Sequence, residues 1–183
     1  MTVHGGIHGG IHGGDAWQVG QELGVDAAVL LDFSANINPR GLPQRARERL
    51  ARDASDPRLL GRYPDRSAHH LRSALSEQLA VPPETIAIGP GAESLLAPIL
   101  RCLQPHRVLV PVPAFSEYGR VCAQQQIEFV PFPLLREESF RTPVDRLCQS
   151  IASEPIGVVL LNNPHNPSGA MLEPPEVQLT AMG

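Results

Sequence analysis

The chain has 183 residues, of which 42% are hydrophobic and 19% are charged, with a formal net charge of -4. This composition is typical of a soluble globular domain and excludes a disordered or fibrous protein. The acidic balance and the 4% aromatic content exclude a basic surface with interleaved aromatic side chains, so neither nucleic acid nor a membrane is expected as a partner. Because no apolar run approaches about 20 residues and no apolar signal segment is present, we expect the chain in the cytoplasm.

Two counts of reactive side chains limit the chemistry of this chain. The 15 basic residues, counted as lysine and arginine together, are all arginine, and no lysine occurs anywhere in the sequence. The chain alone therefore carries out no reaction that needs a lysine amine. Cys102, Cys122 and Cys148 each fall in an apolar helical pattern, so we expect reduced core thiols rather than a disulfide or a zinc site.

A glycine and histidine repeat, HGGIHGGIHGGD, occupies residues 4–15. Its histidines are His4, His8 and His12. This spacing brings imidazoles together for a metal ion only on a helix, and glycine costs a helix about 1 kcal/mol per residue relative to alanine. We therefore predict no metal site here and interpret His4 and His8 as part of a duplicated extension.

Four short apolar runs rich in valine and isoleucine alternate with helical patterns along the chain. The runs are ETIAIG (84–89), RVLVPV (107–112), IEFVPF (127–132) and IGVVLL (156–161). Runs of this length and composition are typical of strands buried on both faces. They predict a parallel sheet.

Helical patterns lie ahead of these runs and between them. Leu71, Leu75 and Leu79 follow one face of 67–80, with Ser67 as a candidate N-cap, and this helix is expected to pack on the sheet. Further helices are predicted around Leu95, Ile99 and Leu103, over 115–126, and over 142–153 with Thr142 as N-cap. The alternation of strands and helices predicts an α/β fold with right-handed crossovers.

Three loops after predicted strands are the candidates for chemistry, because ligands of open parallel sheets bind at the carboxyl ends of the strands. GPGAES (89–94) presents backbone N–H groups and the positive end of a helix, which either bind an anion or form only a tight turn. PAFSEYG (113–119) places Phe115 and Tyr118 one helical turn apart, as ligand contacts or as core. NNPHNPSG (162–169) has no apolar side chain apart from proline, which favours a ligand.

Together with LDFSANINPRG (31–41) and RYPD (62–65), these loops resemble the pyridoxal-phosphate enzymes of the aspartate aminotransferase superfamily. Their order and spacing are similar to the histidinol-phosphate aminotransferase branch. Within it, HGGD followed by a short helix and LLDFSANINPRG most resembles the threonine-phosphate decarboxylases of cobalamin biosynthesis. The resemblance implies a three-layer α/β/α fold with a mostly parallel sheet, of which this chain is the N-terminal portion. It also implies pyridoxal 5'-phosphate as cofactor, a phosphorylated amino-acid substrate and a homodimer.

The resemblance assigns cofactor contacts to particular residues. It implies that the backbone of Ala92 and Glu93 binds the cofactor phosphate, that Phe115 stacks on the pyridine ring, and that Asn166 donates to the phenolic oxygen. Tyr63 is similar to a tyrosine that reaches the cofactor phosphate of the neighbouring subunit.

Substrate contacts are implied for the N-terminal part of the chain. His12 matches a histidine that holds the substrate phosphate, and Ser34 and Asn36 are expected to meet the substrate. Asn36 and Asn38 are also typical turn residues ahead of Pro39, and this alternative stays open.

The cofactor of such enzymes forms its Schiff base with a lysine, which in this family lies downstream of the NPSG loop. The chain has no lysine, so it supplies no catalytic residue and is predicted to be inactive by itself. We predict an N-terminal arm over 1–42 and an incomplete large domain over 43–183, from either a truncated reading frame or a partial sequence. The alternatives are a histidinol-phosphate aminotransferase and a non-catalytic phosphate-binding module.

Overall fold

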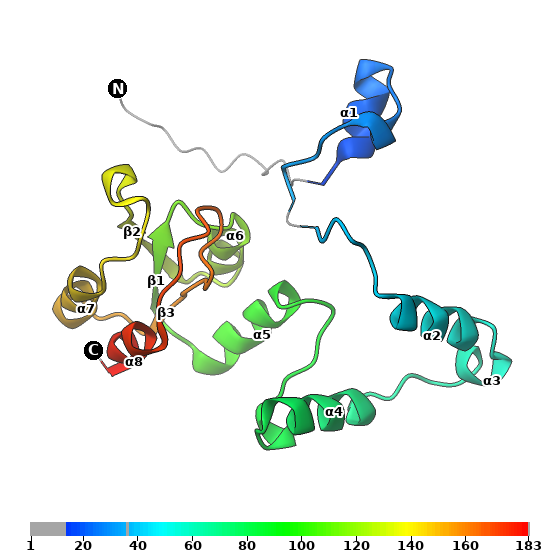
Figure 1. Ribbon diagram of the computed structural model, residues 1–183. Helices are drawn as coiled ribbons and strands as arrows, with labels where there is room; N and C mark the ends of the chain where they lie inside the picture. The colour runs from blue at the N-terminus through cyan, green and yellow to red at the C-terminus, as the bar shows by residue number, and fades with distance from the viewer. Residues whose placement is uncertain (1–13, 36, 183) are drawn as a thin grey trace. The chain divides into compact units, whose positions relative to one another are not determined.

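The computed structural model describes residues 14–35 and 37–182, which fall into two units, Met1–Ser67 and Ala68–Gly183 (Figure 1). The first unit contains α1 (Ala16–Leu23), the 3-10 turn η1 (Ala27–Val29), α2 (Gln44–Ala54) and α3 (Pro57–Leu60). The second begins with α4 (His69–Leu79), η2 (Pro83–Thr85), α5 (Glu93–Leu103), β1 (Arg107–Val112) and α6 (Glu117–Gln124). It continues with β2 (Glu128–Pro133), η3 (Arg136–Glu138), α7 (Val144–Ser153), β3 (Val158–Val159) and α8 (Pro174–Met182). The domain boundary after residue 42 stays a prediction.

The second unit is built on a three-stranded parallel sheet with the order β2-β1-β3. Arg107 lies opposite Glu128 at the start of the β1–β2 pair, and Val108 lies opposite Val158 in the β1–β3 pair. The structure confirms the strand predicted over 107–112 and, displaced by one residue, the strand predicted over 127–132. The strand predicted over 156–161 is confirmed only in part, as the two-residue strand β3, which pairs with β1.

Both faces of the sheet are covered, because successive residues of β1 point to opposite faces. One face carries a buried cluster contributed by β1, α5 and α6, namely Leu100, Val108, Val110, Val121 and Cys122. The other carries a cluster contributed by β1, β2, the segment after β2 and α7, namely Leu109, Phe132, Leu134 and Leu147. Figure 1 shows α6 and α7 on opposite sides of the strands. This arrangement confirms the predicted three-layer α/β/α fold with a parallel sheet.

Two leucines of α5 should contribute very differently to stability, because Leu100 is 0% exposed and Leu103 is 58% exposed. We expect Leu100→Ala to lower the free energy of unfolding by about 2–5 kcal/mol, since it removes packing and leaves a cavity. Leu103→Ala should lower it by less than about 1 kcal/mol. Urea denaturation followed by circular dichroism measures both, and equal losses would show that α5 does not pack on the sheet through Leu100.

The strand predicted over 84–89 is wrong. The segment begins with the 3-10 turn η2, closed by a hydrogen bond of 2.6 Å from the Thr85 hydroxyl to the Pro82 carbonyl. Ile86 then has an extended backbone, and Ile86 and Ile88 are half-buried, so the alternating pattern persists without a ladder. An extended segment becomes a strand only when a neighbour pairs with it, and no described strand does so here.

The helix predicted over 67–80 forms as α4, but it packs on η2 rather than on the sheet. Leu71 and Leu79 are consequently exposed. The missing strand over 84–89 explains this difference, because that strand would have tied the neighbourhood of α4 to the sheet.

Two predicted helix caps and one predicted core thiol are also wrong. α4 has Ala68 at its N-cap position instead of Ser67, and α7 has Pro143 instead of Thr142, both without a capping side-chain hydrogen bond. Cys102 is exposed because it lies two residues after Leu100, about 200° further round the helix. Cys122 is buried as expected, and burial raises the pKa of its thiol.

Within the first unit, several large apolar side chains are exposed. Trp17 is 69% exposed and Phe33 is 92% exposed. α2 has no buried residue, and its polar surface includes an ion pair of 2.9 Å between Arg49 and Asp53.

Across residues 14–35 and 37–182, no helix combines the length and the apolar character that a membrane crossing requires.

Candidate functional site

Two of the predicted loops leave the sheet at the same edge. β1 ends at Val112 and leads into the loop that carries Phe115, and β3 ends at Val159 and leads into 162–169. The two strands are parallel neighbours, so their carboxyl ends lie at one edge of the sheet. The structure therefore brings the aromatic loop and the Asn-Pro loop to the same end of this unit.

The glycine turn before α5 presents unused backbone donors. Gly91 has a φ of +89°, which favours glycine, and a Cβ on Gly89 would lie 2.7 Å from side-chain atoms of Ser94 and Leu95. The Ser94 hydroxyl donates to the Gly91 carbonyl at 2.7 Å and closes the turn. No described residue accepts a hydrogen bond from the N–H of Ala92 or Glu93. These donors and the helix dipole form a cradle for an anion.

Phe115 is held by the helix that follows it. Its ring meets the ring of Tyr118 edge to face, with centroids 5.7 Å apart and an interplanar angle of 83°. Both side chains are half-buried, and burial raises the pKa of the Tyr118 hydroxyl. Tyr118 packs against the buried cluster on the α5 and α6 side of the sheet, which fixes it as a support for Phe115.

An ion-pair network, which the sequence patterns did not single out, joins the glycine turn to α6. Arg120 Nη2 lies 2.8 Å from Glu93 Oε1, and Arg120 also contacts the carboxylate of Glu117 one helical turn earlier. The Glu117 side chain is only 5% exposed. The hydrogen bond to Glu117, opposed by desolvation, and the charges of both carboxylates raise the pKa of Arg120. The Glu-x-x-Arg spacing of 117 and 120 was the only local signal for this network.

The Asn-Pro loop is held by its own side chains. Asn162 Oδ1 accepts a hydrogen bond of 2.8 Å from the backbone N–H of Asn166. Asn163 exchanges two hydrogen bonds, of 2.9 and 3.0 Å, with the backbone of Leu172. The buried His165 ring contacts the Ser168 hydroxyl at 2.7 Å. In the part of the chain that the structure describes, no residue hydrogen-bonds the side-chain amide of Asn166, which leaves it available for a ligand.

The predicted residues of the first unit show a local arrangement of their own. The Ser34 hydroxyl accepts a hydrogen bond of 2.8 Å from the Gly14 N–H and donates one of 2.5 Å to Asp32. This bond from Ser34 lowers the pKa of Asp32. Asn38 Oδ1 accepts a hydrogen bond of 3.0 Å from the Arg40 N–H, which confirms its turn-forming role.

The other predicted site residues of the first unit are Tyr63, His12 and Asn36. The Tyr63 side chain is 85% exposed, and none of the hydrogen bonds found among the described residues involves it. His12 and Asn36 lie outside the described residues, as do His4 and His8. Among the described residues, no group of His, Cys, Asp and Glu side chains could hold a metal ion.

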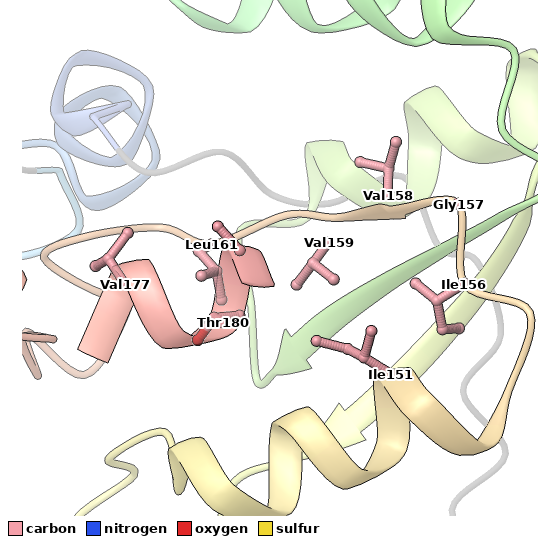
Figure 2. A pocket seen from close by; sticks show the side chains of 9 residues that line it. Ile151, Ile156, Gly157, Val158, Val159, Leu161, Val177 and Thr180 are labelled. Atoms are coloured by element: carbon pink, nitrogen blue, oxygen red, sulfur yellow. The ribbon is translucent and has the colours of Figure 1, made fainter. Parts of the chain in front are cut away.

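A separate pocket of about 320 Å³ lies beside β3, between α7 and α8 (Figure 2). Figure 2 shows Ile151, Ile156, Val159, Leu161 and Val177 around it. Its lining has no charged or acid–base side chain, so it offers no group for catalysis.

Most of the chain matches a known protein family. The family described as aminotransferase class I and II matches residues 28–181 of the chain. The chain belongs to this family. The match includes the turn with Asn38, the glycine turn, the aromatic loop and the Asn-Pro loop.

Relatives in the family include both enzymes suggested by the motifs. A threonine-phosphate decarboxylase from Salmonella typhimurium is 33% identical over 159 residues, which are 87% of this chain and 42% of the relative. A histidinol-phosphate aminotransferase from Natronomonas pharaonis is 30% identical, over 91% of this chain and 46% of the relative. The chain spans less than half the length of these curated relatives.

The fold is likewise shared with a solved aminotransferase. Histidinol-phosphate aminotransferase from Sinorhizobium meliloti, in complex with pyridoxal-5'-phosphate, superposes with a TM-score of 0.72 and 25% identity. The superposition covers 81% of this chain and 39% of that one.

Pyridoxal 5'-phosphate is the cofactor of this family, and the described residues of the second unit fit it. The free N–H groups of Ala92 and Glu93 suit a phosphate, the supported ring of Phe115 suits a pyridine face, and the free amide of Asn166 suits a ring oxygen. One feature fits less well, because the Glu93 carboxylate brings a negative charge to the anion cradle. The individual contacts stay predictions.

Proposed function

We propose that this chain forms the N-terminal part of a pyridoxal-phosphate-dependent decarboxylase that converts L-threonine O-3-phosphate to 1-amino-2-propanol phosphate in cobalamin biosynthesis. The supporting observation is the 33% identity with the Salmonella threonine-phosphate decarboxylase over 87% of the chain. The alternative, a histidinol-phosphate aminotransferase, is supported by the 30% identity with the Natronomonas enzyme. Both relatives are named for phosphorylated substrates.

The cofactor, when bound, supplies the electron sink for the charge that a departing carboxylate leaves behind. In this proposal the residues of this chain bind and orient the cofactor. The turn at Ala92 and Glu93 holds the cofactor phosphate, Phe115 covers one ring face, and Asn166 donates to the ring oxygen. This chain does not supply the lysine that holds the cofactor, because its sequence contains none.

The substrate and the dimer complete the proposal. His12 binds the substrate phosphate, and Ser34 and Asn36 meet the substrate. The bond between Ser34 and Gly14 supports this, because it ties the segment that follows His12 to the turn that carries Ser34. Tyr63 reaches the cofactor phosphate of a second copy in a homodimer, and its 85% exposure leaves the hydroxyl free for such a contact.

Reconstitution tests the proposed reaction. The purified chain is mixed with pyridoxal 5'-phosphate and the C-terminal part of the Salmonella relative, which carries what this chain does not span. When both parts are present, we expect L-threonine O-3-phosphate to lose carbon dioxide and give 1-amino-2-propanol phosphate. Neither part alone should give this product. Light scattering should return the mass of a dimer of such pairs.

The same mixture distinguishes the alternatives. Histidinol phosphate with a 2-oxo acid as amino acceptor replaces the threonine phosphate. Transamination without decarboxylation would favour the aminotransferase. Cofactor binding with neither reaction would favour the non-catalytic phosphate-binding module and contradict the proposal.

A further inference from the structure

Glu93 brings an acidic side chain to the turn that forms the anion cradle. It belongs to the first turn of α5, the positive end of the helix dipole, and the N–H groups of Ala92 and Glu93 at that end have no acceptor among the described residues. A carboxylate in this position is attracted to the same end of the helix as a phosphate. Unless something holds it elsewhere, Glu93 competes with an anionic ligand by charge and by hydrogen bonding.

Arg120 is placed to hold the Glu93 carboxylate away from the N–H groups of Ala92 and Glu93. Its Nη2 lies 2.8 Å from Glu93 Oε1, across 27 residues of sequence. The guanidinium is itself fixed by Glu117, whose side chain is only 5% exposed and one helical turn away on α6. A buried carboxylate attracts a cation strongly, because solvent screens a partly buried ion pair less than an exposed one. The Glu93 carboxylate is thereby tied to α6 through an anchored arginine.

Arg120 forms ion pairs with both acidic side chains of this network, Glu93 and Glu117. Arg120 and Glu93 are about half exposed, with side-chain exposures of 48% and 50%, so solvent screens their attraction. Removing the arginine would release Glu93 toward the cradle and leave both carboxylates without their shared cation.

We propose that Arg120 is a positioning residue, which holds the Glu93 carboxylate off the N–H groups of α5 so that the turn accepts a phosphate monoester. Glu93 therefore lowers the affinity of the turn for phosphate and makes that affinity depend on Arg120. This inference rests on the proposed function, since it concerns the turn that would hold the cofactor phosphate.

The test is a mutant cycle on non-covalent binding. The probe is pyridoxamine 5'-phosphate, which carries an amine instead of an aldehyde, and its binding to the full chain is followed by fluorescence anisotropy. We expect Arg120→Gln to weaken binding about tenfold or more, since the released carboxylate competes for charged hydrogen bonds. Glu93→Gln should tighten binding a few-fold. The double variant should regain an affinity within about threefold of the unmodified chain.

Two controls separate positioning from general effects. Arg146→Gln breaks an ion pair of similar exposure, at 3.3 Å from Glu138, and should leave binding unchanged. Pyridoxamine, which lacks the phosphate, should bind at least about tenfold more weakly and respond to neither substitution. Circular dichroism follows folding, and Glu93→Gln keeps the inference testable if Arg120→Gln unfolds the chain, because it leaves Arg120 and Glu117 paired.

Several results would overturn the inference. A folded Arg120→Gln chain that Glu93→Gln does not rescue would make Arg120 a structural residue only. Unchanged affinity in Glu93→Gln would show that this carboxylate does not compete. If no variant binds pyridoxamine 5'-phosphate, the turn is no phosphate site in this chain. The proposed reaction is judged separately, by the products of the reconstituted mixture.

Discussion

Pyridoxal 5'-phosphate added to this chain should attach covalently to no side chain. The cofactor aldehyde is captured by lysine amines, and the sequence contains none among its 183 residues. Borohydride reduction followed by peptide mass mapping should therefore find the pyridoxyl group only on the amine of Met1. The effect is all or none, because no other residue type supplies a comparable amine.

A chain acetylated at its N-terminus is the matched control for this measurement. It should take up no reducible label while still binding the cofactor reversibly. A pyridoxyl adduct on any internal residue would contradict the prediction and would mean that another nucleophile of this chain captures the aldehyde.

Asn166 should matter for ligand binding, and Asn163 should matter for stability. Asn166→Ala removes a side-chain amide that no described residue uses, so folding should be unaffected. If that amide donates to the cofactor, its loss should weaken pyridoxamine 5'-phosphate binding by about 10–100-fold, which corresponds to one hydrogen bond to a charged group. Asn163→Ala instead removes both hydrogen bonds to Leu172 and should lower the free energy of unfolding by about 1–3 kcal/mol.

Fluorescence anisotropy and urea denaturation on the same two variants measure both effects. The crossed pattern is the informative result, since each variant serves as the control of the other. A loss of stability in Asn166→Ala with unchanged binding would show that Asn166 is a loop residue without a ligand.

The interior of the second unit could be predicted largely from local patterns. The valine-rich run over 107–112 became the central strand, because an apolar segment of that length is stable only when both faces are buried. The loops with Phe115 and Asn166 were predicted at one edge of the sheet, since parallel strands place their carboxyl ends together. The strand predicted over 84–89 does not form, because pairing requires a neighbouring strand that the segment itself does not specify.

By itself, the sequence determined that these 183 residues contain no lysine, that the chain alternates strands and helices, and which loops carry the family motifs. Those properties depend only on the composition and on the short-range order of residues along the chain. Only the tertiary structure decided which polar groups are already used and which are free. Asn163 is bonded to Leu172 and Asn166 is not, and Arg120 holds Glu93 from 27 residues away. Such pairings depend on how α5, α6 and the strands pack, because side chains distant in sequence meet only when those elements are in place.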